Sequence, residues 1–266
     1  MEDYLKIKKD ALIEYFRNLG SAAVAFSAGV DSTLLLTLAF EALGDRAVAI
    51  TAVCPSFPER EALEAKRFCE ERGIRHIVLS FDQFAVEGFR LNPVNRCYLC
   101  KKELFTLVKK TARENSCEYV AEGSNTDDLS DYRPGMRAIE ELGVKSPFLD
   151  LSMSKADIRA LSAQMNLPTF SKPSFACLAT RFVYGEEITE EKLEAVEKAE
   201  QELIDRGFSH VRVRVHGDIA RIEVEKADIP ALVKIADEIN EKFTSLGFAY
   251  ATLDLGGYRL GSMNRF

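Results

Sequence analysis

The sequence lacks the features of membrane, secreted and nucleic-acid-binding proteins. No apolar run is long enough to span a bilayer, and Met1-Glu2-Asp3-Tyr4 is not the basic beginning of a secretory signal. Basic residues are not in excess, because 35 Lys and Arg stand against 42 Asp and Glu and leave a net charge of −7. A nucleic-acid partner usually requires a basic face. We therefore expect a cytoplasmic protein that binds neither membranes nor nucleic acids.

The Gly-Lys-Ser/Thr ending of the P-loop of kinases and GTPases is also absent, but another anion-binding pattern is present. An apolar run, Val24 to Phe26, ends in Ser-Ala-Gly, and a long helical pattern begins at Asp31. A strand, a tight turn and a helix N-terminus present free backbone N–H groups to a phosphate. Gly29 has no Cβ and tolerates positive φ, which allows close approach. The residues expected to bind the nucleotide are Ser27, Ala28, Gly29, Val30, Asp31 and Ser32.

Asp31 is the unusual member of this loop. A carboxylate repels a phosphate unless Mg²⁺ lies between them or the carboxylate caps the helix. The stretch resembles the Ser-Gly-Gly-x-Asp-Ser loop of the ATP pyrophosphatase (PP-loop) superfamily, with Ala28 in place of the usual first glycine. Those enzymes split ATP between its α and β phosphates and adenylylate a substrate oxygen. The alternative is an ordinary turn between a strand and a helix, with Asp31 as a cap.

Apolar strand patterns alternate with helical patterns through the first two thirds of the chain. Buried strands are expected at 47–53, 74–79 and 118–121, and helices at 4–18, 58–72, 101–115 and 154–165. This alternation predicts an α/β fold with a doubly wound, mainly parallel sheet, whose ligands bind off the carboxyl ends of the strands. The resemblance implies the adenine nucleotide alpha hydrolase-like fold. The predicted PP-loop domain covers residues 1–184.

From residue 189 the order becomes helix, two alternating strands, helix and strand, which predicts a small C-terminal α+β domain over residues 185–266. Strict alternation from Val211 to Val215 buries one face and places Arg212 and Arg214 together on the other. Two arginines in register are either solvated surface residues or a site for a substrate phosphate or carboxylate.

A second polar stretch, Glu122 to Asp128, follows the strand at 118–121. In the pyrophosphatase superfamily a stretch of this kind lies against the nucleotide, which implies contacts from Gly123, Ser124, Asn125 and Asp127. Carboxylates together with phosphate oxygens suit Mg²⁺, and Asp31 and Asp128 are the candidate ligands. The alternative is a solvated turn, because these residue types are also good turn formers.

Cys97 and Cys100 form a C-x-x-C motif where a loop meets a helix. Such a motif is typical of a redox pair, half of a zinc site or part of an iron–sulfur site. A zinc site needs four N or S ligands, and none of the three histidines lies near a cysteine in sequence. Together with Cys177, three thiolates can hold a [4Fe–4S] cluster that leaves one iron open. The other cysteines, Cys54, Cys69 and Cys117, are expected to be small buried hydrophobic residues.

Several motifs together resemble the LarE family of ATP-dependent sulfur transferases, across essentially the whole chain. They are the phosphate loop, the 122–125 stretch, the segment 174–181, the Arg-x-Arg hairpin and the ending 253–264. The resemblance implies synthesis of the nickel-pincer nucleotide, the cofactor of lactate racemase. A carboxylate of pyridinium-3,5-biscarboxylic acid mononucleotide is adenylylated, and sulfur then displaces AMP to leave a thiocarboxylate. The family tends to form ring-like oligomers, so we expect a homo-oligomer.

Family members differ in their sulfur source. Some sacrifice the sulfur of one cysteine, matching Cys177 here, whereas others with three cysteines bind a [4Fe–4S] cluster thought to carry sulfide. Cys97, Cys100 and Cys177 favour the cluster type, although its sulfide donor is unknown. Arg181, four residues after Cys177, is expected to lower the pKa of the attacking sulfur or to bind phosphate.

Three alternatives stay open. A tRNA thiolation enzyme shares the loop but needs an RNA-binding surface, against which the net charge of −7 argues. An amide-forming ligase of the same superfamily needs an ammonia source and has no use for three cysteines. A nucleotide-binding regulatory module would release no pyrophosphate.

Overall fold

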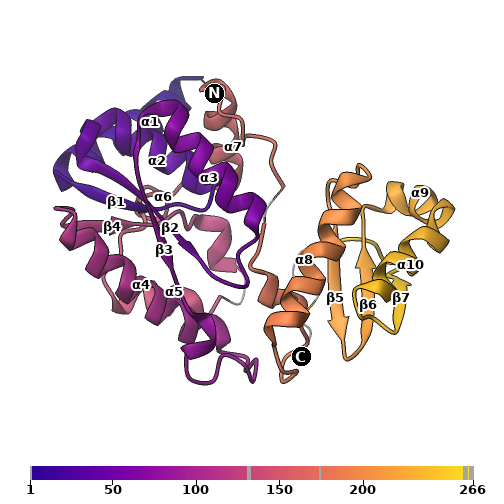
Figure 1. The fold of residues 1–266 in the computed structure, drawn as a ribbon. Helices are drawn as coiled ribbons and strands as arrows, with labels where there is room; N and C mark the ends of the chain where they lie inside the picture. The colour runs from indigo at the N-terminus through magenta and orange to yellow at the C-terminus, as the bar shows by residue number, and fades with distance from the viewer. Residues whose placement is uncertain (1, 131–132, 174, 260–262, 264–266) are drawn as a thin grey trace. The chain divides into compact units, whose positions relative to one another are not determined.

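The computed structural model describes residues 2–130, 133–173, 175–259 and 263 (Figure 1). The chain divides into two compact units. The first unit consists of Met1–Val86 and Asn95–Phe175, and the second of Glu87–Val94 and Ala176–Phe266. Residues 176–184 thus group with the second unit, whereas the sequence analysis assigned them to the PP-loop domain. The domain boundary at residue 184 stays a prediction.

A four-stranded parallel sheet forms the centre of the first unit. Its strands are β1 (Ala22–Ala25), β2 (Ala47–Val53), β3 (Arg75–Ser80) and β4 (Tyr119–Ala121), in the order β3-β2-β1-β4. Alternate residues of β1 point to opposite faces, so that Ala22 and Val24 enter one core and Ala23 another. The predicted α/β fold with a parallel sheet is confirmed.

Helices cover both faces of this sheet (Figure 1). Side chains of α1 (Glu2–Leu19), α2 (Val30–Leu43), α3 (Glu59–Arg72) and α7 (Lys155–Gln164) share one core, and those of α4 (Arg96–Glu114) and α5 (Gly135–Glu141) the other. The short helix α6 is Pro147–Asp150. The chain after β1 enters α2, whereas β4 is reached from α4 on the opposite face. The order of strands therefore switches between β1 and β4, the place where ligands bind in such sheets.

The second unit contains a three-stranded sheet in the order β5-β6-β7. Strands β5 (Arg212–His216) and β6 (Ile219–Glu223) are antiparallel, and β7 (Tyr250–Leu253) is parallel to β6. Helix α8 (Glu190–Asp205) precedes the hairpin, as predicted. The helix predicted after it is instead two helices, α9 (Ile229–Lys234) and α10 (Ala236–Ser245), which are separated at Ile235.

Helix α4 differs from its prediction in a way that affects the C-x-x-C motif. It begins at Arg96 rather than Lys101, so Cys97 and Cys100 both lie in the first turns of the helix. Within the described part of the chain, no helix combines the length and the apolar character required to cross a bilayer.

Candidate active site

The predicted phosphate loop connects β1 to α2 and is closed by its own serines. Ser32 Oγ accepts a hydrogen bond from the Ser27 N–H at 3.3 Å, lies 3.2 Å from Ser27 Oγ, and donates to the Gly29 carbonyl at 3.2 Å. These bonds fix the turn directly before the first residue of α2. The first N–H groups of a helix have no partner within the helix, so this loop presents donors at the carboxyl edge of the sheet.

The left-handed residue of the loop is Ala28, and the prediction that Gly29 supplies positive φ is wrong. Ala28 has φ +54°, whereas Gly29 is extended with φ −79°. A Cβ at Gly29 would lie 3.5 Å from Ser27 Oγ, which is an ordinary contact. The left-handed conformation costs a residue with a Cβ about 1 kcal/mol. The strain therefore lies at the position where the PP-loop pattern usually has its first glycine.

The two predicted nucleotide-binding stretches meet at Asp31. Because Val24 of β1 pairs with Ala121 of β4, the loops after these strands leave the sheet side by side. A Cβ at Gly123 would lie only 3.0 Å from the Asp31 Cβ, and Asn125 Nδ2 donates to Asp31 Oδ1 at 3.3 Å. Ser124 bonds instead to Glu122, at 3.1 Å through its N–H and 2.8 Å through its hydroxyl.

Lys155 is a site residue that the sequence analysis missed. Its ammonium group pairs with Asp31 Oδ2. It is the first residue of α7, where Ser154 and Asp157 form the predicted capping box, and its N–H lies 3.4 Å from Asp127 Oδ1. Burial raises the pKa of Asp31, the Lys155 charge opposes that shift, and the Asp128 charge adds to it. The capping box was the only signal in the sequence that located this lysine.

The proposed Mg²⁺ ligands already have protein partners. Asp128 Oδ2 accepts from the Asn125 N–H at 3.0 Å, and Oδ1 pairs with Arg133 at 2.8 Å. Among the residues that the structure describes, no group of three or more His, Cys, Asp or Glu side chains is arranged to hold a metal ion. Asp31 and Asp128 as Mg²⁺ ligands stay a prediction.

A second lysine holds the back of the loop. Lys172 Nζ donates to the Ala28 carbonyl at 3.1 Å and pairs with Glu61 at 2.7 Å and Glu64 at 2.6 Å. Two carboxylates on α3 thus fix Lys172, and Lys172 in turn binds the strained residue of the phosphate loop.

The cysteines of the C-x-x-C motif each accept a hydrogen bond. Arg96 Nη2 lies 3.6 Å from Cys97 Sγ, and Gln83 Nε2 lies 3.2 Å from Cys100 Sγ. Cys177 is exposed and directly precedes a short 3-10 turn, Leu178–Arg181. Because Cys97 and Cys100 belong to the first unit and Cys177 to the second, their convergence on one cluster stays a prediction.

The predictions for the other three cysteines divide. Cys69 and Cys117 are buried, as expected, and burial raises the pKa of the Cys69 thiol to about 12, which makes it inert. Cys54 is only half-buried, and its Sγ lies 3.8 Å from the Ser56 hydroxyl. The expectation that Cys54 is a purely hydrophobic residue is wrong, because the chain after β2 places it in a polar network.

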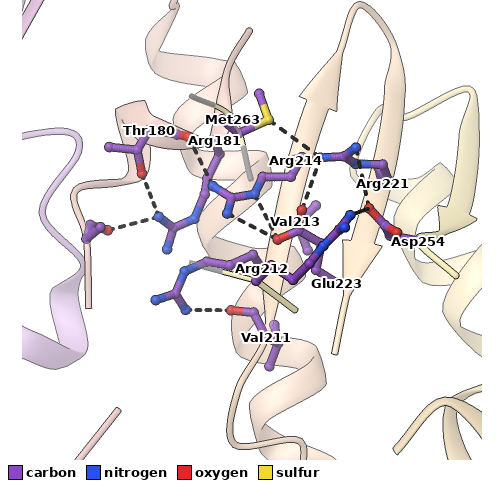
Figure 2. A network of polar contacts seen from close by, with 12 residues as sticks. Thr180, Arg181, Val211, Arg212, Val213, Arg214, Arg221, Glu223, Asp254 and Met263 are labelled. Atoms are coloured by element: carbon purple, nitrogen blue, oxygen red, sulfur yellow. Dashed lines mark hydrogen bonds and ion pairs between the residues drawn. The ribbon is translucent and has the colours of Figure 1, made fainter. Parts of the chain in front are cut away.

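Arg181 is a buried structural cation (Figure 2). Its Nε and Nη2 atoms form a two-pronged pair with Glu200 at 2.7 and 3.1 Å, and Nη1 donates to the Ala176 carbonyl and to Thr180 Oγ1. Burial alone would raise the pKa of Glu200, but the Arg181 charge and hydrogen bonds lower it. A catalytic role for Arg181 stays a prediction, whereas these contacts fix the backbone on both sides of Cys177.

Arg212 and Arg214 are both buried, so the alternative of solvated surface arginines is wrong. Arg214 pairs with Glu223 at 3.1 Å and donates to the Thr180 carbonyl, as Figure 2 shows. Arg212 donates to the Val211 carbonyl at 2.7 Å and lies 5.2 Å from the centre of the Tyr258 ring. Burial lowers the pKa of Arg212 to about 10, so it still carries a charge at neutral pH.

Parts of two quoted motifs lie outside the described residues. These are Ser174 of the 174–181 segment, and residues 260–262 and 264 of the C-terminal ending.

No family model matches the chain. The chain is 36% identical to the pyridinium-3,5-bisthiocarboxylic acid mononucleotide synthase of Lactiplantibacillus plantarum, over 98% of this chain and 95% of that protein. It is 42% identical to an uncharacterized protein of Synechocystis, over 98% of each chain. A more distant likeness connects it to a glutamine-hydrolyzing GMP synthase of Archaeoglobus fulgidus, with 26% identity over 70% of this chain and 66% of the other.

Proposed function

This chain belongs to the LarE family, the family of the L. plantarum synthase. From that premise we propose that it is an ATP-dependent sulfur transferase that converts a carboxylate of pyridinium-3,5-biscarboxylic acid mononucleotide to a thiocarboxylate in nickel-pincer nucleotide synthesis. The likeness to the synthase over the whole chain carries this proposal. The meeting of the loops after β1 and β4 at Asp31 supports the use of ATP.

The reaction has two stages. A carboxylate oxygen of the substrate attacks the α phosphorus of ATP, the bond from that phosphorus to the bridging oxygen breaks, and pyrophosphate leaves. A sulfur nucleophile then attacks the acyl carbon, and AMP leaves with the electrons of the carbon–oxygen bond. The N–H groups of residues 27–32 bind the phosphates and stabilise the charge that develops on the leaving group.

Lys155 provides the cation that this phosphate loop lacks. Its ammonium group neutralises Asp31, whose pKa burial raises. A phosphate close to the loop attracts the same ammonium group, so Lys155 contacts the nucleotide when Asp31 turns to another cation. Asp31 and Asp128 have the hard oxygen ligands that suit Mg²⁺, which when bound offsets charge on the departing pyrophosphate.

The thiols of Cys97 and Cys100 suit a soft metal centre, since iron–sulfur clusters are held by cysteine thiolates. Together with Cys177 they would hold a [4Fe–4S] cluster, which when bound supplies sulfide at an open iron. Arg212 and Arg214 would bind the phosphate or the carboxylates of the substrate. Four arginines, Arg181, Arg212, Arg214 and Arg221, lie with three carboxylates, Glu200, Glu223 and Asp254, and this excess of positive charge favours an anionic ligand.

The test is turnover in the absence of oxygen with ATP, Mg²⁺ and the biscarboxylate nucleotide, followed by pyrophosphate release and product mass. Asp31→Asn is expected to abolish pyrophosphate release, whereas Asp45→Asn, a matched change at an exposed carboxylate, leaves it unchanged. Cys177→Ser is expected to keep pyrophosphate release and lose the thiocarboxylate. No substrate-dependent pyrophosphate release from the unaltered protein would overturn the proposal.

A further inference from the structure

A buried glutamine lies against the C-x-x-C motif. Gln83 is only 2% exposed and begins a short 3-10 turn, Gln83–Ala85, shortly after β3. Asp82 caps this turn by accepting hydrogen bonds from the N–H groups of Phe84 at 2.9 Å and Ala85 at 3.2 Å. The backbone that carries Gln83 is therefore fixed before its side chain makes any contact.

The orientation of the Gln83 amide is set by its neighbour Ser56. The oxygen, Oε1, accepts from the Ser56 N–H at 3.3 Å and from the Ser56 hydroxyl at 2.6 Å. A backbone N–H can only donate, so Oε1 must face Ser56 and the amide nitrogen must point away from it. That nitrogen, Nε2, lies 3.2 Å from Cys100 Sγ. The sulfur of Cys100 is thus the acceptor of a bond whose donor cannot turn round.

We propose that Gln83 is a positioning residue for Cys100, which presets the sulfur to bind a soft metal centre together with Cys97. Burying an amide is costly unless its polar atoms are bonded, and here both of them are. The bond ties the loop after β2, the turn after β3 and the start of α4 to one sulfur. Cys97 receives a corresponding donor, Arg96, so each sulfur of the motif has a side-chain N–H directed at it.

Groups of this kind orient metal ligands and tune the metal. A hydrogen bond donated to a metal-bound thiolate withdraws electron density from the sulfur, and such bonds contribute to the reduction potential of a cluster. The iron–sulfur centre itself rests on the proposed function. The positioning of Cys100 does not, because any metal that prefers thiolates reports it.

The experiment is a titration of the metal-free protein with Co²⁺ alone, without oxygen, ATP or substrate. Thiolate-to-cobalt charge transfer is read by absorption, and Cys100→Ser identifies the part of the band that depends on Cys100. Gln83→Met removes the donor at similar side-chain length, and we expect Co²⁺ affinity to fall by about tenfold and the band to move to lower energy. Gln164→Met, the same change at an exposed amide on α7, is expected to alter neither.

Ser56→Ala keeps the experiment decisive if Gln83→Met does not fold. It removes one of the two donors that hold the Gln83 amide, and a smaller change in the same direction is expected. Unchanged affinity and band position in the folded variants, or no thiolate band in the unaltered protein, would overturn the proposal. An effect of Gln83→Met in a protein that makes no thiocarboxylate would instead retain the positioning role and remove the proposed function.

Discussion

Replacing Glu200 by Gln tests the buried pair that supports the Cys177 segment. The two side chains are nearly isosteric, and glutamine keeps an oxygen to accept from Arg181 Nε and from the Val213 N–H, which now donate to Glu200 Oε1 at 2.7 and 2.9 Å. What the substitution removes is the negative charge beside a guanidinium that is 0% exposed. The variant therefore isolates the charge from the shape.

The magnitude follows from burial. Removing one partner of a buried ion pair costs about 3–5 kcal/mol, because the remaining charge is left without compensation. The retained hydrogen-bond acceptor places Glu200→Gln at the lower end, about 3 kcal/mol. If the chain melts in one transition, the thermal midpoint falls by about 6–12 °C.

Urea unfolding followed by circular dichroism measures this loss directly. The pKa of Glu200 is lowered in the folded protein, so its contribution is present above its ordinary value of 4.5 and disappears as the pH falls below that value. The difference in unfolding free energy between the unaltered protein and Glu200→Gln is therefore expected to shrink below pH 4.5.

The matched control is Glu194→Gln on the same helix, where an exposed carboxylate pairs only with the exposed Lys198 at 2.6 Å among the contacts described. Surface pairs of this kind contribute about 0–1 kcal/mol. A loss in Glu200→Gln no larger than that of the control, or a difference that does not depend on pH, would refute the account of this pair.

Three further substitutions probe the first unit. Lys155→Met leaves the buried Asp31 without its ammonium partner, and we expect pyrophosphate release to fall at least tenfold while Lys66→Met on the surface of α3 leaves it unchanged; equal rates would contradict the role of Lys155. Gly123→Ala places a Cβ 3.0 Å from that of Asp31, so ATP affinity measured by calorimetry is expected to fall. Lys172→Met removes two charged hydrogen bonds to α3 and is expected to cost about 2 kcal/mol in urea unfolding.

The sequence predicted the sheet and the location of the site because these depend on local patterns. Continuous apolar runs and the alternation of strands with helices are visible without tertiary structure. The loops at residues 27–32 and 122–128 were both identified, and parallel pairing of β1 with β4 brings them together as the fold rules require.

The missed features are those that long-range packing decides. Lys155 lies 124 positions from Asp31, and no periodicity connects a lysine at a helix start with a distant loop. The alternation around Arg212 and Arg214 predicted a second face correctly but not its burial, since their cover comes from other segments of the second unit. Left-handed geometry at Ala28 rather than Gly29 was equally invisible, because alanine rarely adopts it.

The measurement that tests the central claim most directly is the mass of product and protein together after anaerobic turnover with ATP and the biscarboxylate nucleotide. The account predicts several thiocarboxylates per chain, an unchanged protein mass, and iron and labile sulfide that are lost in Cys97→Ala. Loss of one sulfur and two hydrogens at Cys177, with a single product per chain, would contradict the cluster and favour a sacrificial cysteine. No thiocarboxylate would contradict sulfur transfer itself.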